Sequence, residues 1–350
     1  MFRFLILFLS VIPALGPLLA QSAPGSQPTD HLPAHMRQLT SFGERADWSH
    51  DGTKLVFLSK TFGDAMELDL DSGAIRNLTA HYPHFGYTRA LYLVNGNILL
   101  AGPREFDLNN TRHARRNCWL FVLTPGSVQP AAPLGIKANE GPAVSRTRLH
   151  IAWTDWHDPA PDSDDRFYSR MYRGDIAYNA EGVPGVTRRE LIADSRETGL
   201  AGAMETQNFR PPHENELIFS LYTGGGRHCD VMGIDLTTRA ITAYTNSPDG
   251  YEEPEGIYPD GTATLVEADM HNQDGPRRVD WWRLPLDGSG PATRLTFFSD
   301  FQNYKCSNPV VSDDGRYIAG QIAKSTDDFG VGHGLILYDT VAAEKSAALD

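Results

Sequence analysis

Short apolar segments separated by turn residues run along most of the chain, and their order repeats. Near the amino end, RQLTSFGERADWSHDGTKLVFLS is followed by the strand-like MELDL, the turn DSG and the strand-like IRNLT. The same order returns near the carboxyl end, in RLTFFSDFQNYKCSNPVVSDDGRYIAGQIA and GLILYDT, where Ser312 to Gly315 correspond to Ser49 to Gly52. Repetition of this kind indicates a fold built from similar units.

Weaker copies of the pattern fill the middle of the chain. They are ALYLVNGNILLAG with CWLFVLTPG, PAVSRTRLHIAWTD with GDIAYNAEGVPGVTRRELI, NFRPPHENELIFSLY with CDVMGIDLTTRAITAYT, and EGIYPDGTATLVEAD with VDWWRLPLDGSGPATRLT. Each unit offers four short strands at a spacing of about 45 to 55 residues, without a long helical periodicity. This predicts an all-β fold, a single β-propeller of four-stranded blades, in which six blades are visible and a seventh is possible if one long unit hides two. An open sandwich would also be all-β, but it explains neither the repeat nor its ends.

The two ends of the repeat region complement each other. The last unit stops after its third strand, 335–339, while the segment 36–40 forms a strand without a unit of its own. If this amino-terminal strand becomes the fourth strand of the last blade, the ring closes and leaves no free sheet edge. We therefore expect the propeller to span residues 37–350.

The segment before the propeller has a different character. Residues 1–22 hold one basic residue, an apolar run interrupted by Pro13 and Pro17, and small residues, which is the pattern of a secretory signal peptide. A linker follows at 23–36. We expect an exported protein, secreted or extracellular, or periplasmic in a bacterium.

The net charge of −13 narrows the range of partners. An acidic chain is repelled by nucleic acid and by anionic membrane surfaces, so we expect neither as a partner, and a polyanionic substrate would need a local basic pocket. Cys118, Cys229 and Cys306 lie far apart without a C-x-x-C pair, which argues against a disulfide framework and against a thiolate zinc site. We expect a monomer with at most one disulfide.

The short and the long connections fall on opposite faces of the predicted propeller. The turns SHDG, VNGN, PPHEN, YPDG and SDDG join the first and second strands of their blades and reach one face. The other face receives long polar segments, among them AHYPHFGYT, PREFDLNNTRHARRN, DWHDPAPDSDDRFYSRMYRG and YTGGGRHCD, and seven of the twelve histidines. Long loops on a rigid scaffold are where functional sites are usually built, so we expect the site on this second face.

The repeats RxLT, W-S-x-D-G-x-x-L-x-F, D-L-x-S/T-G and LT resemble those of TolB-type propellers and cover most of the chain. Among secreted members, the chain is similar to the propeller-shaped polysaccharide lyases, namely oligogalacturonate lyases and the lyases that cleave rhamnosyl-glucuronate ends. The resemblance implies β-elimination at a uronic-acid glycosidic bond of an acidic oligosaccharide or polysaccharide. Oligogalacturonate lyases place histidines as metal ligands before a proline in a late blade, where this chain has Lys305, Cys306 and Asn308. This departure makes pectin fragments a less secure substrate and favours rhamnosyl-glucuronate ends.

Histidine, tyrosine and arginine in the long loops suit this chemistry. A bidentate arginine or a cation neutralises the uronate carboxylate, a histidine or tyrosine removes the acidified C5 proton, and a second such group protonates the departing oxygen. The candidates for catalytic roles are His81, His84, Arg166, Arg227, His228 and Tyr251. The candidates for substrate binding are Arg89, His157, Tyr168, Asn208, His271 and Tyr304.

These candidates also have structural interpretations. His81 and His84, our first choice for the base, could instead pack or cap the turn between the first two blades, and Arg89 could belong to the strand that follows. Arg227 and His228 come after TGGG, whose glycines would allow close backbone approach to a ligand but equally suit a flexible hairpin.

A cation is a further open point. Glu140, Glu205 and Glu255 fall near the start of the innermost strands of successive blades. There they could ring the channel and hold calcium or manganese through oxygen ligands, or they could cap backbone amides. The sequence requires no cofactor and does not assign the metal ligands.

Two other functions fit parts of the pattern. A non-catalytic propeller that binds protein or glycan is the main alternative, since many TolB-type propellers are of that kind. A serine peptidase with a propeller is disfavoured, because the sequence lacks a G-x-S-x-G elbow and runs in propeller repeats to its end.

Overall fold

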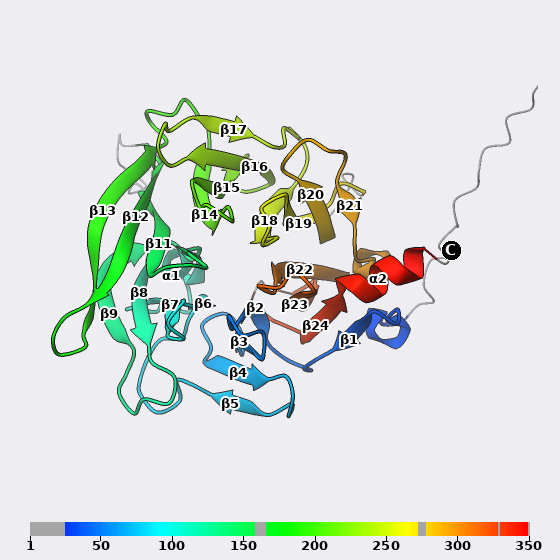
Figure 1. The fold of residues 1–350 in the computed structure, drawn as a ribbon, viewed down its shortest axis with the longest axis horizontal. Coiled ribbons are helices and arrows are strands. Elements are labelled where there is room, and N and C mark those ends of the chain that lie inside the picture. The colour runs from blue at the N-terminus through cyan, green and yellow to red at the C-terminus, as the bar shows by residue number, and fades with distance from the viewer. Residues whose placement is uncertain (1–24, 158–165, 272–277, 328–329, 349–350) are drawn as a thin grey trace, which may run out of the picture.

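The computed structural model describes residues 25–157, 166–271, 278–327 and 330–348. Within them, six four-stranded antiparallel sheets stand around a central channel as the blades of a β-propeller (Figure 1). Each predicted unit is one blade, and the described segments contain no seventh. The propeller predicted from the repeat is confirmed, while the predicted signal peptide, 1–22, lies outside the described residues.

The strands follow the chain blade by blade, from the channel outward. The first blade holds β2 (Glu44–Trp48), β3 (Lys54–Leu58), β4 (Ala65–Asp69) and β5 (Ile75–Asn77), and the second β6 (Arg89–Tyr92), β7 (Ile98–Pro103), β8 (Cys118–Leu123) and β9 (Ala132–Ala138). The third holds β10 (Ala143–Val144), β11 (His150–His157), β12 (Tyr168–Tyr178) and β13 (Pro184–Asp194), and the fourth β14 (Ala203–Phe209), β15 (Glu216–Thr223), β16 (His228–Asp235) and β17 (Ile241–Ala243). The fifth holds β18 (Glu252–Ile257), β19 (Ala263–Ala268), β20 (Asp280–Pro285) and β21 (Thr293–Arg294), and the sixth β22 (Tyr304–Val311), β23 (Tyr317–Lys324), β24 (Leu335–Asp339) and β1 (Met36–Gln38).

The amino-terminal strand closes the ring as predicted. β1 pairs antiparallel with β24, with Arg37 opposite Leu337. The pairing continues past β1, since the amide of Leu39 donates to the carbonyl of Leu335 at 2.8 Å. The last blade is therefore made from both ends of the propeller sequence.

Apolar side chains from neighbouring blades form the core between them. Leu55 and Phe57 of the first blade pack with Leu335 and Leu337 of the sixth. Trp48 adds a polar tie across the same boundary, because its indole Nε1 donates to the carbonyl of Val310 at 3.1 Å. Burial of this kind is the main force that holds the blades together.

The short turns at the far end of the channel connect blades through ion pairs. Arg146 of the third blade lies 2.6 Å from Oδ1 of Asp313 in the sixth blade and 3.8 Å from Asp47 in the first. His50 also contacts Asp313, at 2.7 Å. These short connections therefore link three blades around the channel.

Helices are few and short. α1 (Thr111–Arg116) lies in the connection between β7 and β8, and α2 (Thr340–Ala347) follows β24 at the periphery of the ring (Figure 1). The segment expected as a linker contains the 3-10 turn η1 (Pro28–His31), and η2 (Phe298–Asp300) precedes β22. None of the described helices has the length and apolar character needed to cross a membrane. All three cysteines are buried free thiols.

Candidate functional site

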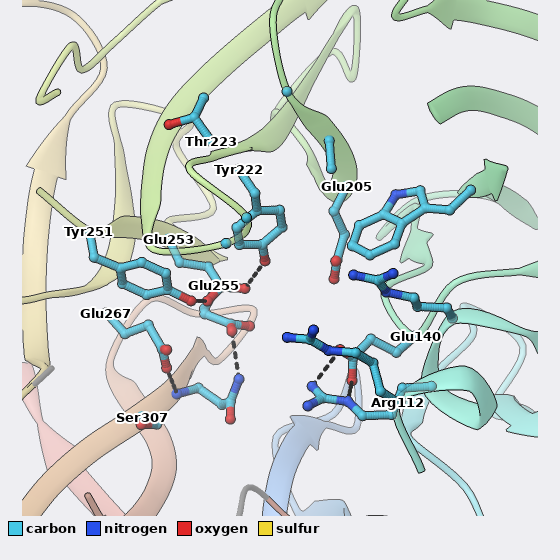
Figure 2. Close-up of a pocket in the computed structure, with 18 of the residues that line it drawn as sticks. Arg112, Glu140, Glu205, Tyr222, Thr223, Tyr251, Glu253, Glu255, Glu267 and Ser307 are labelled. Carbon is cyan, nitrogen blue, oxygen red and sulfur yellow. Dashed lines mark hydrogen bonds and ion pairs between the residues drawn. The ribbon is translucent and has the colours of Figure 1, made fainter. Parts of the chain in front are cut away.

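A cavity of about 860 Å³ occupies the channel. Its walls include residues of the innermost strands, and its mouth includes connections between second and third strands, such as α1 and the segment Gly224 to Gly226. Carboxylates, guanidinium groups and tyrosines face one another across it (Figure 2). The cavity therefore opens on the face that was expected to carry the site.

Glu140, Glu205 and Glu255, the three glutamates predicted to ring the channel, all line this cavity. Glu140 accepts two hydrogen bonds from Arg115, one of them from Nε at 2.9 Å, and lies 3.1 Å from Nη1 of Arg45. Burial would raise the pKa of Glu140, but the two guanidinium groups outweigh it and lower the pKa to about 2. Glu140 is therefore an ionised carboxylate already held by two cations.

Glu205 of β14 has a different environment. Its side chain is 3 % exposed, and its carboxyl makes no hydrogen bond or ion pair with the part of the chain that the structure describes. Burial, and then the charge of Glu140, raises the pKa of Glu205 from 4.5 to about 8. Gly141 makes room for the carboxyl, since a Cβ at that position would lie 2.1 Å from its Oε1. Figure 2 shows Glu205 directed into the open centre of the cavity.

Irregularities in the innermost strands bring polar side chains to the channel. β2, β14, β18 and β22 each contain a register shift against their neighbour, and such bulges re-aim side chains. Arg45 and Asn308 lie in two of these shifts with positive φ angles of 54° and 49°, a costly conformation for residues other than glycine. Glu255, at the β18 shift, accepts from Asn308 Nδ2 at 2.5 Å and from Arg89 Nη2 at 3.0 Å.

Arginines surround the mouth of the cavity on one side. Arg112 and Arg116 come from α1, and Arg166 precedes β12. Arg116 lies over the ring of Trp156, 5.5 Å from its centre. Within the described segments neither Arg112 nor Arg166 has an ion pair. An anionic ligand could therefore bind these two guanidinium groups without displacing a described carboxylate.

Two tyrosines from neighbouring blades share one carboxyl on the opposite wall. Tyr222 of β15 donates a short hydrogen bond to Oε1 of Glu253, and Tyr251, just before β18, donates one to Oε2 (Figure 2). Burial raises the pKa of Tyr222 and of Glu253 well above their ordinary values. Tyr222 therefore keeps its proton at neutral pH and is a potential proton donor.

A group of three carboxyls on this wall could hold a cation. Glu253, Glu255 and Glu267 each offer an oxygen, and these oxygens all lie within 4.8 Å of one another. Oxygen-only donor sets suit hard cations such as calcium or manganese. The ring of Glu140, Glu205 and Glu255 is a poorer donor set, since Glu140 is already paired with arginines.

Three of the twelve predicted site residues line the cavity. Arg166 and Tyr251, predicted as catalytic, both line it. Arg89, predicted to bind substrate, begins β6 and lines it as well, although its guanidinium is engaged by Glu255. The sequence therefore identified one of the arginines at the mouth of the cavity, Arg166, and one of the two tyrosines that contact Glu253, Tyr251.

His81 and His84 do not line the cavity. Nδ1 of His84 accepts from the amide of Gly86 at 2.9 Å, and its Nε2 lies 3.0 Å from Asp64 Oδ1, while Nε2 of His81 lies 3.3 Å from the carbonyl of Gln129. Both rings thus form contacts that hold the connection between the first two blades, which agrees with the structural interpretation of these histidines. A catalytic role for them stays a prediction that the cavity does not support.

Residues near β12 and β16 also lie around the cavity without lining it. The ring of His157 stacks on Tyr168 with centres 4.5 Å apart. Arg227 and His228 lie at the start of β16, beside the glycines that do reach the cavity.

The remaining predicted binding residues have local partners. Asn208 Nδ2 donates to the backbone carbonyl of Glu255 at 3.1 Å, and Tyr304 lies under Nζ of Lys324. His271 Nε2 is 2.6 Å from Ser299 Oγ, and burial lowers the pKa of His271 to about 4. A role in binding stays a prediction for these three.

Several residues that line the cavity were not predicted from the sequence. The EEPEG motif places Glu253 two residues before Glu255, a spacing that puts both on one face of a regular strand, and this spacing could have revealed Glu253. Arg112 lies in a connection that was expected to be functional, but without a pattern to single it out. Arg45 had no sequence pattern, because it reaches the channel through a bulge.

Comparisons with known proteins confirm the fold and leave the activity open. The chain matches no family model, and no curated protein matches it. A gluconolactonase from Xanthomonas campestris has a similar structure, with 14% identity, a TM-score of 0.52, and 87% of this chain and 88% of that chain covered. An oligogalacturonate lyase from Vibrio parahaemolyticus (10% identity, TM-score 0.48, 87% and 93% covered) and TolB from Acinetobacter baumannii (16%, 0.43, 82% and 64%) are more loosely similar. At these identities the likeness shows a propeller fold that enzymes also use.

Proposed function

We propose that this protein is a lyase that cleaves a uronic-acid glycosidic bond of an acidic oligosaccharide or polysaccharide by β-elimination, with rhamnosyl-glucuronate ends as the favoured substrate. The observation that carries the proposal is the buried carboxyl of Glu205, which has no partner among the described residues, in a cavity whose mouth holds Arg112 and Arg166. β-Elimination needs both kinds of group, a cation for the uronate carboxylate and a base for the C5 proton.

Different residues that line the cavity bind the substrate carboxylate and remove the proton. Arg112 and Arg166 bind the uronate carboxylate and withdraw charge from it, which acidifies the proton on C5. Glu205 in its ionised form takes that proton, and the electron pair of the C–H bond forms the C4–C5 double bond. The C4–O bond breaks, and its electron pair leaves with the oxygen. A base whose pKa is about 8 is well matched to this step near neutral pH.

The departing oxygen takes its proton from a phenol. Tyr251 is a catalytic candidate from the sequence, and Tyr222 donates to the same carboxyl of Glu253. No oxidant, reductant or nucleophile is needed, because the proton taken by Glu205 and the proton given by the phenol balance. The proposal also includes a divalent cation, calcium or manganese, at the wall that holds Glu253, Glu255 and Glu267.

The test is a search for the unsaturated product. The protein is incubated with uronate oligosaccharides, including gum-derived ones with rhamnosyl-glucuronate ends, and the absorbance of the new C4–C5 double bond is followed. We expect turnover on at least one substrate, with kcat/KM rising as the pH approaches 8. Glu205→Gln should lower kcat at least about 100-fold, since it removes the base.

Glu181→Gln is the matched control, because Glu181 is exposed in the turn between β12 and β13 and does not line the cavity. It should keep full activity. Absence of product across the panel would refute the lyase, and binding without product would support the alternative of a non-catalytic glycan-binding propeller. Full activity of Glu205→Gln would refute the assignment of the base.

A further inference from the structure

Three acidic side chains are buried together on the wall formed by β18 and β19. Glu253 lies directly opposite Glu267 in the ladder between these strands, and Glu255 follows at the register shift. All three are less than a tenth exposed. Like charges directly opposite one another in a sheet are destabilising, and burial increases the cost, so the arrangement needs a compensating partner.

The compensation provided by the chain itself is incomplete. Among the described residues, Arg89 is the one cationic side chain in contact with the three carboxyls, 3.0 Å from Glu255. The other contacts are neutral, from the phenols on Glu253, from Asn308 Nδ2 on Glu255 and from the Asn308 amide on Glu267 at 3.0 Å. If all three are ionised, one guanidinium leaves two negative charges without a cationic contact.

A hydroxyl next to this group also lacks a partner. Ser307 is 4 % exposed and lines the same cavity, but its buried Oγ makes no hydrogen bond with any described residue. It precedes Asn308, whose amide contacts Glu267, and Figure 2 shows Ser307 beside Glu267. Buried hydroxyls are nearly always hydrogen-bonded, so an unpaired one at an acidic cavity wall is available to a ligand.

We propose that Glu253, Glu255 and Glu267 bind one divalent hard cation, with Ser307 Oγ as an additional oxygen ligand. Calcium takes oxygen ligands at about 2.3–2.6 Å, so ligands on opposite sides of one ion are up to about 5 Å apart. The spread of the carboxyl oxygens, within 4.8 Å, matches this. A bound ion would favour the ionised form of these carboxyls, and with all three ionised its charge of +2 balances the two negative charges that Arg89 leaves. This cation site does not depend on the proposed lyase activity.

Terbium luminescence tests the site without any substrate. Tb³⁺ replaces calcium at oxygen sites and emits when a nearby aromatic side chain is excited, and Tyr222 and Tyr251 both contact Glu253. We expect a saturable emission from the wild-type protein that calcium or manganese displaces. Emission that is absent, or that neither ion reduces, would overturn the proposal.

Variants locate the ion within the wall. Glu267→Gln should weaken Tb³⁺ binding more than about tenfold, since even outer partners of a metal ligand typically contribute about 10- to 100-fold. Ser307→Ala should weaken it by a smaller factor. Glu252→Gln is the matched control, because Glu252 lies in the same strand but bonds to Ser247 instead, and its affinity should match the wild type.

Thermal denaturation provides a second measurement. A ligand that binds only the folded protein raises its stability, so millimolar calcium should raise Tm relative to chelator in the wild type and in Glu252→Gln. In Ser307→Ala, which loses only one hydroxyl, the rise should be smaller. An equal rise in all variants would place the ion elsewhere. Because neither readout involves turnover, an inactive protein that binds Tb³⁺ would refute the lyase and leave the cation site standing.

Discussion

Glu205 and Glu140 lie in one cavity but differ in charge state. Arg115 and Arg45 hold Glu140 ionised, whereas the described segments offer no partner to Glu205, and burial favours its neutral form. Two carboxyls whose pKa values are pushed apart in this way can play different roles at the same pH. Of these two carboxyls, Glu205 is the one that responds to pH near neutrality.

This response should appear in the stability of the protein. In the folded state Glu205 keeps its proton up to about pH 8, whereas an unperturbed glutamate releases it near 4.5. The folded state therefore binds the extra proton between these values, and its stability falls as the pH rises through this window. Glutamine does not titrate, so the Tm of Glu205→Gln relative to the wild type should increase by at least about 3 °C from pH 5 to pH 9. Equal Tm differences at both pH values would contradict the raised pKa.

Individual site residues were predictable where the repeat determines their direction. The repeat placed Glu140, Glu205 and Glu255 near the start of the innermost strands, and all three line the channel, although Glu140 lies before β10 and Glu255 lies at the β18 register shift. His81 and His84 lie in a connection, and the repeat gives the face of such a segment but not whether it turns inward. That depends on contacts such as His84 with Asp64, which pair residues of different segments.

At the scale of elements, β1 is the piece that closes the ring. It comes from the amino end yet pairs with β24, so its hydrogen bonds join segments nearly 300 residues apart. Repeat spacing predicted this pairing, because an orphan strand and an incomplete blade complement each other. The same reasoning missed α1, since TRHARR is too short for an apolar period and its helix begins at a local cap, the side chain of Asn110.

Replacing Leu39 by proline should weaken the pairing of the amino-terminal segment with β24, which closes the ring. Leu39→Pro removes the amide that donates to Leu335, while Leu39→Ala removes the same side chain and keeps the amide. We expect the proline variant to unfold at least about 4 °C below the alanine variant, with faster hydrogen exchange at the amides of β24. Identical melting and exchange in the two variants would show that this hydrogen bond does not stabilise the closed ring.

The whole molecule separates its charges. The net charge of −13 repels anions at long range, yet the mouth of the cavity presents arginines from α1 and from the segment before β12. An acidic saccharide is therefore disfavoured over most of the surface and attracted at one place. This arrangement meets the requirement, evident from the sequence alone, that a polyanionic substrate needs a local basic pocket.

The attraction should depend on Arg112 and Arg166 and on salt. In the double variant Arg112→Gln/Arg166→Gln, the Kd for a glucuronate-containing tetrasaccharide should rise at least about tenfold at low ionic strength, measured by calorimetry. The difference from the wild type should shrink toward 1 M salt, where the screening length falls to about 3 Å. Arg188→Gln/Arg239→Gln removes the same charge away from the cavity, because Arg188 is 85% exposed on β13 and Arg239 follows β16. An equal loss of affinity in this control would mean that net charge, and not the arginines at the mouth, governs binding.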